Sequence, residues 1–357
     1  MLRKILAATL SLALLVGLSA CGATDNAGSS GANQSAGGLT VATLNQLDAW
    51  PAYAAMKDDV ADKYGISYEM KLYKAGFQLV EDSALEKWQI GDVGAVPALL
   101  GVLNRHLSVV GIAADESDAN ALMVKANSPL LKEESNGVLG SADAVRGKAI
   151  YTTQASSAHR LVAAYLKKLD LTEADVNLQY ASQADCLAAL GDGRADIVSL
   201  WAPNTYEAEE IAGGAKTLAK GSDLGVTNYM VYVVDSAWAK NNKDAIARFL
   251  ATVGHEAGAF EEVKDADLVA FFKDYAKADL DEKRIADERK SHQLFTVEEQ
   301  LALMSDGDLQ KSLDDVATFF LQINRFADSN YGQLTKMNFG ITDEYLKAAQ
   351  KLEEKAS

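Results

Sequence analysis

Cysteine, histidine and positive charge are scarce in this chain. Its 357 residues include two cysteines and four histidines, and Asp and Glu outnumber Lys and Arg by 50 to 34. Histidines without a cysteine cluster give no zinc signature. The net charge of -16 disfavours nucleic acids, whose phosphates require basic surfaces, and broad adhesion to anionic lipid. We therefore expect no metal, no cofactor and no nucleic-acid partner.

The first cysteine, Cys21, ends a pattern that is typical of a secretory signal. Arg3 and Lys4 precede an apolar run that is too short to span a bilayer well, and small residues lead into Cys21. With cysteine directly after the cut, the pattern resembles a bacterial lipoprotein signal, residues 1–20. We predict an extracytoplasmic protein anchored to the cell membrane through lipid on Cys21. An ordinary signal peptide with an incidental cysteine is the alternative.

The second cysteine, Cys186, is alone in the mature chain, so an intramolecular disulfide is excluded. It lies in the apolar helical pattern Asp185–Leu190, and we expect a buried structural thiol rather than a nucleophile. Residues 21–38 are rich in Gly, Ala, Ser and Asn, a composition that predicts a flexible tether to the folded body.

From residue 39 onwards, short apolar strands alternate with amphipathic helices. The predicted strands are Leu39–Leu44, Ile66–Tyr73, Ile90–Pro97, Leu107–Ala114, Lys148–Thr153, Asn177–Ala181 and Ala195–Leu200. This order is typical of an α/β fold, and its restart after residues 128–143 indicates two lobes, each with a mostly parallel sheet flanked by helices. The division is lobe 1 (39–125), lobe 2 (126–228), and a return to lobe 1 with C-terminal helices (229–357).

Ligands of parallel α/β sheets bind beyond the carboxyl ends of the strands, where helix N-termini point their amides. The residues at those positions form the predicted ligand site: Gln46, Trp50, Gly94, Ala95, Asp115, Glu116, Gln154, Ser156, Ser157, His159, Trp201, Asn204 and Asn228. The Gly-Asp pairs at 91–92 and 191–192 are interpreted as turns rather than catalytic sites.

Three features of this predicted site indicate its chemistry. Ser156 and Ser157 begin a helix and could bind a compact oxyanion, although helix capping explains the same pattern. Trp50 and Trp201 suit the aromatic walls of an organic-ligand site, and packing between helix and sheet explains them too. The acidic pair at 115–116 could accept the ammonium group of a zwitterion, or could be solvated loop carboxylates.

Several short motifs occur in a specific order: Trp50–Ala55, Gln89–Gly94, Val145–Lys148, Ser156–His159, Gly193–Asp196 and Trp201–Pro203. Together with the lipoprotein signal, they resemble the substrate-binding proteins of ABC importers for nitrate, sulfonates and taurine. The resemblance covers Leu39 to about Tyr331. It implies the type II periplasmic binding protein fold, with two lobes that close on a small solute.

The same resemblance implies partners and a substrate class. The partners are an ABC permease with its cytoplasmic ATPase, and the protein itself is expected to be a monomer. The acidic pair Asp115-Glu116 departs from a site for a purely anionic ligand, which favours a taurine-like zwitterion over nitrate. We therefore expect a receptor for a sulfonate, taurine-like or related solute, and not an enzyme.

Three alternatives stay open. The same binding role could serve a pyrimidine precursor of thiamine, stacked between Trp50 and Trp201. An enzyme on this fold, such as a dehydratase with His159 and Asp115 as acid and base, is disfavoured by export. A surface adhesin or structural lipoprotein would lack a cleft with saturable ligand binding.

Overall fold

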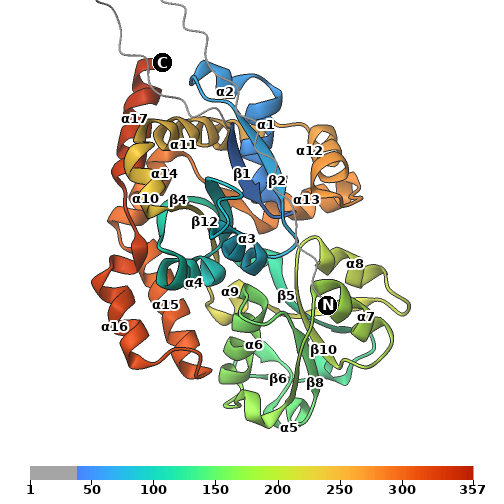
Figure 1. Cartoon of the computed structure of the whole chain (residues 1–357). Helices are drawn as coiled ribbons and strands as arrows, with labels where there is room; N and C mark the ends of the chain where they lie inside the picture. Colours follow the sequence, from blue (N-terminus) through green and yellow to red (C-terminus); the bar gives the residue numbers. More distant parts are fainter. Residues whose placement is uncertain (1–37, 357) are drawn as a thin grey trace, which may run out of the picture. The chain divides into compact units, whose positions relative to one another are not determined.

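The computed structural model describes residues 38–356 of the chain (Figure 1). The predicted signal peptide, the lipidation site Cys21 and nearly all of the predicted tether lie outside the described residues. Within residues 38–356, no helix combines the length and the apolar character needed to cross a membrane.

Lobe 1 is built on a six-stranded sheet with the order β13-β4-β12-β3-β1-β2. Its strands are β1 (Leu39–Thr43), β2 (Tyr68–Leu72), β3 (Ile90–Gly94), β4 (Leu107–Asp115), β12 (Tyr229–Asp235) and β13 (Gln293–Leu294). Strands β2, β1 and β3 are parallel, whereas β12 pairs antiparallel with both β3 and β4. The carboxyl ends of β1 and β3 therefore lie at one edge of the sheet.

Lobe 2 is built on a five-stranded sheet with the order β11-β5-β10-β8-β9. Its strands are β5 (Asn120–Lys125), β8 (Ala149–Thr152), β9 (Asn177–Tyr180), β10 (Ile197–Trp201) and β11 (Ala215–Lys220), with a hairpin of β6 (Glu134–Ser135) and β7 (Val138–Leu139). Strand β5 is paired here, so lobe 2 begins near residue 120 rather than at the expected 126.

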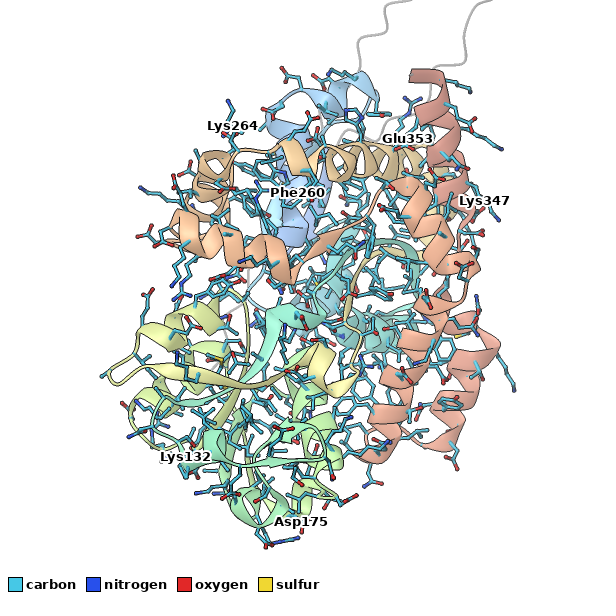
Figure 2. The ribbon with its side chains drawn as sticks, turned by 180° about the vertical axis from the view of Figure 1, so that it is seen from behind. Lys132, Asp175, Phe260, Lys264, Lys347 and Glu353 are labelled. Atoms are coloured by element: carbon cyan, nitrogen blue, oxygen red, sulfur yellow. The ribbon has the colours of Figure 1, made fainter. Side chains whose placement is uncertain are left out.

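Helices cover both sheets (Figure 1). Those of lobe 1 are α1 (Trp50–Lys57), α2 (Val60–Lys63), α3 (Gly76–Ser83), α4 (Ala95–Arg105), α10 (Ser236–Asn241), α11 (Lys243–Gly258), α12 (Asp265–Phe271), α13 (Glu282–Ser291), α14 (Val297–Ser305), α15 (Asp308–Gln322), α16 (Asp328–Lys336) and α17 (Glu344–Ala356). Those of lobe 2 are α5 (Ala142–Val145), α6 (Ser157–Lys168), α7 (Gln183–Gly191), α8 (Asn204–Glu210) and α9 (Gly221–Leu224). Figure 2 shows Lys132 and Asp175 on lobe 2, and Phe260, Lys264, Lys347 and Glu353 on lobe 1.

The core of lobe 1 forms where α11 packs against the sheet. Phe249 of α11 is fully buried and lies edge-on to the rings of Tyr68 and Tyr232, with centroids 5.6 and 5.3 Å away. Burial of such side chains removes apolar area from water and is the main stabilising contribution. In lobe 2, Cys186 is buried, and burial raises its pKa to about 12. The expectation of an unreactive structural thiol is confirmed.

The chain crosses between the lobes twice, and the two crossings are bonded to each other. The first, β4 to β5, passes through the 3₁₀ turn Ser117–Ala119, and the second joins β11 to β12 through residues 221–228. The Glu116 N–H donates to the Asn228 carbonyl (3.0 Å), and the Asn228 N–H donates to Ser117 Oγ (2.8 Å). A Cβ at Gly221 would lie 2.2 Å from the Ser117 carbonyl oxygen, so the crossings touch without side chains between them. We call this pair of crossings the hinge.

The predicted two-lobed α/β fold with a helical C-terminal part is confirmed. Each parallel core, β2-β1-β3 and β9-β8-β10, consists of predicted strands. Both sheets are nevertheless mixed, because strands β5, β11 and β12 run antiparallel to a neighbour. The strand-helix alternation predicted none of these three strands, nor the two-residue strands β6, β7 and β13. Strands β5, β11 and β12 each adjoin one of the two hinge crossings.

Candidate functional site

Four buried carboxylates lie around the carboxyl ends of the lobe 1 strands. Asp48 follows β1, Asp92 lies within β3, Glu116 follows β4, and Glu288 comes from α13. None is more than 2% exposed. The charge of Asp48 acts on each of the other three, so Asp48 lies at the centre of the group. We call Asp48, Asp92, Glu116 and Glu288 the acidic cluster.

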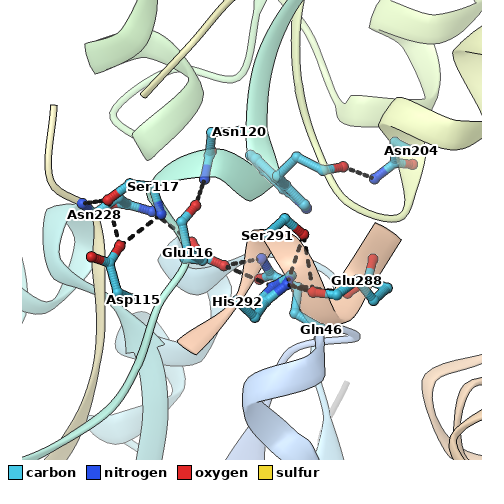
Figure 3. Close-up of polar contacts among 11 residues, drawn as sticks. Gln46, Asp115, Glu116, Ser117, Asn120, Asn204, Asn228, Glu288, Ser291 and His292 are labelled. Carbon is cyan, nitrogen blue, oxygen red and sulfur yellow. Dashed lines mark hydrogen bonds and ion pairs between the residues drawn. The ribbon is translucent and has the colours of Figure 1, made fainter. Parts of the chain in front are cut away.

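Glu116 is held by amide groups from both sides of the hinge (Figure 3). Gln46 Nε2 donates to Glu116 Oε2, and Asn228 Nδ2 donates to Glu116 Oε1 over 2.6 Å. Asn120 Nδ2 donates to the backbone carbonyl of Glu116 over 3.1 Å. The carboxylate is therefore oriented by the hinge itself, and a molecule that displaces these amides acts directly on the hinge.

Glu288 and His292 approach the cluster from α13 and the residue after its end. His292 Nδ1 is 3.3 Å from Glu288 Oε2, and His292 Nε2 is 4.0 Å from Glu116 Oε2 (Figure 3). Burial lowers the pKa of His292 to about 4 and raises the pKa of Glu288 to about 8. At neutral pH the imidazole is thus uncharged, and it does not neutralise the carboxylates.

Asp48 and Asp92 form a pair that favours a shared proton. Burial raises the pKa of Asp48 to about 7, and burial together with the charge of Asp48 raises the pKa of Asp92 well above its ordinary value. Between residues 38 and 356, no Lys or Arg makes an ion pair with any member of the acidic cluster. The cluster therefore offers an anion no positive charge, and its acceptors suit cations and N–H donors.

Part of the predicted site meets at this position. Gln46 and Asn228 both donate to Glu116, as described above, and lobe 2 contributes Trp201 and Asn204. Trp201 pairs with Asn120 across β10 and β5, and Asn204 Nδ2 donates to the Trp201 carbonyl over 3.3 Å (Figure 3). Residues from both lobes and from the hinge thus lie within one site.

Other predicted residues lie nearby with different partners. Asp115 Oδ1 accepts the N–H of Ser117 over 2.8 Å and also the hydroxyl of Ser117, so this carboxylate closes a turn. Trp50 is buried edge-on to Phe271, with centroids 5.6 Å apart, as expected for packing, but its Nε1 has no acceptor among the described residues. Gly94 and Ala95 are buried at the junction of β3 and α4, and Gln154 is exposed. Contact of these residues with a solute remains a prediction.

Ser156, Ser157 and His159 lie at the start of α6. Ser156 is the N-cap: its Oγ accepts the His159 N–H over 3.4 Å and donates to the Thr153 carbonyl over 2.6 Å. Ser157 Oγ is half-buried and has no hydrogen-bond partner within residues 38–356. His159 is buried, with Nε2 2.8 Å from Glu173 Oε1 and its ring against Tyr180 and Phe319. Capping thus accounts for Ser156, and an anion-binding role for either serine remains a prediction.

The two serines can be separated by single substitutions. Ser156→Ala removes a cap, so we expect the free energy of unfolding to fall by about 0.5–2 kcal/mol. Ser157→Ala removes no such bond, so we expect a change within about 0.5 kcal/mol. Urea unfolding of the ligand-free protein measures both values. Equal losses for the two variants would contradict the assignment of Ser156 as the cap.

Four residues of this site are absent from the predicted site residues: Asp48, Asp92, Glu288 and His292. Gly91-Asp92 lies in the predicted strand Ile90–Pro97 but was also interpreted as a turn. Both residues lie inside β3, where burial of all five positions leaves Asp92 in the interior. Glu288 and His292 come from a helix far along the chain, and their i, i+4 spacing is the one local sign that they share a face. Among residues 38–356, no group of three or more His, Cys, Asp or Glu side chains has a geometry suited to a metal ion.

Comparisons with known proteins bear on this arrangement. The NMT1/THI5-like family model matches residues 119–257. A curated Escherichia coli protein, named for aliphatic sulfonate binding, is 28% identical over 181 residues, which are 50% of this chain and 53% of that protein. The match thus spans about half the length of this curated relative.

Solved structures extend the likeness to the whole fold. The periplasmic aliphatic sulphonate binding protein SsuA of Escherichia coli superposes with a TM-score of 0.65 at 20% identity, covering 81% of this chain and 94% of SsuA. The periplasmic nitrate-binding protein NrtA of Synechocystis gives a TM-score of 0.67 at 12% identity, covering 88% of this chain and 89% of NrtA. The expected resemblance to the nitrate and sulfonate substrate-binding proteins, and the periplasmic binding protein fold, are confirmed.

Proposed function

We propose that this relative of the nitrate and sulfonate substrate-binding proteins is the extracytoplasmic solute receptor of an ABC importer, and not an enzyme. It binds a small polar solute between its lobes and delivers it to a membrane permease driven by a cytoplasmic ATPase. In this proposal the protein acts as a monomer tethered to the cell membrane through lipid on Cys21. The observation that carries the proposal is the convergence of polar side chains from lobe 1, lobe 2 and the hinge.

A groove between the lobes supports this role. It has a volume of about 200 Å³ and lies between α8 of lobe 2 and α13 of lobe 1, beside the hinge. Ala119, Tyr206 and Ser291 are among its lining residues, and Ser291 directly precedes His292 of the site. A ligand that contacts both lobes favours the closed state by its differential affinity, and no covalent chemistry is required of the protein.

An ion pair spans the same groove. Arg284 of α13 donates from Nη1 to Glu209 of α8 over 2.7 Å, and its guanidinium lies 5.2 Å from the ring centroid of Tyr206. Because these contacts join the two lobes, they form only when the lobes are closed. They add to the free energy of closure, and Tyr206 also contacts Glu288 of the acidic cluster.

Removal of this bridge is expected to weaken solute binding without unfolding the protein. Arg284→Gln loses a partly exposed ion pair, which contributes about 1 kcal/mol or less, so affinity for any solute should fall about two- to fivefold. Arg105→Gln, which removes another ion pair on lobe 1 away from the groove, is the control and should leave affinity unchanged. Titration calorimetry measures both, and an equal loss in the control would contradict the role of Arg284 in closure.

The solute class is the finer part of the proposal. Aliphatic sulfonates and nitrate are the ligands named for the relatives. Among sulfonates, a taurine-like zwitterion suits an acidic site because it also carries an ammonium group. A thiamine-precursor pyrimidine is the second candidate, because its amino group can donate to the unpaired buried acceptors of the site.

A ligand screen tests the receptor function. Taurine, alkanesulfonates, nitrate and hydroxymethylpyrimidines are added to the body from residue 39 onwards, and melting temperature and small-angle scattering are recorded. A true solute should raise the melting temperature with concentration and reduce the radius of gyration as the lobes close. Binding at 1:1 without any closure would contradict the receptor mechanism.

A further inference from the structure

Buried acceptors without donors surround the acidic cluster. Both carboxylate oxygens of Asp48 and of Asp92 have no hydrogen-bond donor among the described residues, and neither has the side-chain oxygen of Asn120 or Asn228. The two asparagine amides cannot simply be turned over, because each Nδ2 already donates to Glu116. Buried acceptors normally have partners. The proton that Asp48 and Asp92 share can satisfy at most two of these oxygens, so the others, those of Asn120 and Asn228 included, need a donor from outside the chain.

The charge of the surroundings specifies the kind of donor. No cationic side chain in residues 38–356 pairs with Asp48, Asp92, Glu116 or Glu288, and His292 is uncharged. A nitrate or a simple sulfonate brings acceptors only and would meet no positive charge here. A protonated nitrogen group supplies the missing donors, and its charge favours the ionised carboxylates over the protonated form that burial imposes without it.

Aromatic side chains lie beside these acceptors. Trp201, buried at the end of β10, pairs in register with Asn120, and Trp50 follows Asp48 by two positions. Aromatic faces attract organic cations as well as apolar groups. Together, the aromatic residues and the carboxylates suit an organic cation better than a hydrated metal ion.

We propose that the solute presents a positively charged N–H group, such as an ammonium, an amidinium or an aminopyrimidinium, to Asp48, Asp92 and Glu116. This inference rests on the receptor function proposed above and specifies its substrate class. The N–H groups donate to the unpaired oxygens of the aspartates and of Asn120 and Asn228, while Trp201 covers the solute from lobe 2. A net anionic solute without such a group is excluded by the same contacts.

Matched probes test the inference. Taurine is compared with isethionate, in which a hydroxyl replaces the ammonium. In a second set, tetramethylammonium, a cation without N–H groups, is the control for propylammonium, acetamidinium and a protonated aminopyrimidine. At least one N–H cation should raise the melting temperature, and its matched partner should not.

In Asp92→Asn, affinity for that probe should fall on the order of 100-fold. Asp279→Asn, an exposed change in the same lobe, should leave affinity unchanged.

Each remaining outcome is decisive. A melting temperature of ligand-free Asp92→Asn at or above that of the natural protein shows that the variant is folded, because the substitution replaces a buried ionisable carboxyl by a neutral amide of the same size. Stabilisation by nitrate or isethionate that persists in Asp92→Asn would overturn the inference and leave the receptor function intact. The absence of stabilisation by every N–H cation would also overturn it. If neither the anionic nor the cationic probes raise the melting temperature, the receptor function itself is rejected.

Discussion

The ligand-free protein is expected to lose stability steeply between pH 6.5 and pH 8. Asp48 and Glu288 have folded-state pKa values of about 7 and about 8, against ordinary values of 3.8 and 4.5. The folded chain keeps the Asp48 proton up to about pH 7 and the Glu288 proton up to about pH 8, whereas the unfolded chain has already released both. Up to those pH values, each retained proton makes stability fall by about 1.4 kcal/mol per pH unit. Asp92 and Glu116 have pKa values raised in the same direction and steepen the decline.

Histidine makes the opposite contribution at lower pH. The folded-state pKa of His292 is about 4, against 6.5 ordinarily, so from pH 6.5 down to pH 4 the unfolded chain binds a proton that the folded chain refuses. This effect reduces stability as the pH falls, and it offsets the pH dependence that one of the carboxyl groups contributes. The decline is therefore steepest just above pH 6.5, where His292 is neutral in both states and Asp48 and Glu288 still hold protons in the folded chain.

Urea unfolding from pH 5 to pH 8.5 measures this profile. Glu288→Gln should flatten it and raise the free energy of unfolding at pH 8 by about 2 kcal/mol, because a buried charge is no longer formed. Glu261→Gln, an exposed change in lobe 1, is the control and should leave the profile intact. Stability that stays level or rises between pH 6.5 and pH 8 would contradict the assignment of protons to the acidic cluster.

Gly221→Ala is expected to destabilise the protein by about 1–3 kcal/mol and to force the hinge crossings apart. The new Cβ would lie 2.2 Å from the Ser117 carbonyl oxygen and 3.0 Å from the Val226 carbonyl oxygen. Both neighbours are backbone atoms, so no side-chain rotation relieves the contact. Because Glu116 adjoins Ser117, solute affinity should fall together with stability.

The matched control is Gly191→Ala. Gly191 lies at the end of α7, and a Cβ there would meet no atom within 4 Å. Alanine is the better helix former, so we expect a change between zero and about 1 kcal/mol of added stability. Thermal unfolding compares the two variants. A loss in Gly221→Ala no larger than in Gly191→Ala would contradict the close contact of the two hinge crossings.

The local sequence pattern predicted the parallel strands and the helices that follow them. The parallel strands β1, β2, β3, β8, β9 and β10 each precede a helix that covers them, so apolar runs and helix starts alternate visibly. Strand β12 is as apolar as these, but its place between β3 and β4 depends on a return from the other lobe, 135 residues after β3. Such long-range pairing leaves no periodic sign in the sequence.

The residues of the candidate site differ in the same way: some follow from local pattern and others depend on tertiary packing. Gln46, Glu116 and Asn228 were predictable because each follows a strand or begins one at the expected edge. Asp92 was missed because a Gly-Asp pair is typical of turns, and burial of an aspartate within a strand runs against its usual preference. Glu288 and His292 depend on where α13 packs, which is decided by tertiary contacts with α12 and the hinge turn.

The isolation of Cys186 makes the folded body suitable for conversion into a fluorescent sensor. From residue 39 onwards it is the one thiol in the sequence, and it is fully buried and protonated at working pH. A cysteine introduced at Lys290 or at Thr217, which line opposite sides of the groove, would therefore react with a maleimide dye while Cys186 stayed silent. The dye would report lobe closure as a change in emission, and the native Cys186 would stay in place.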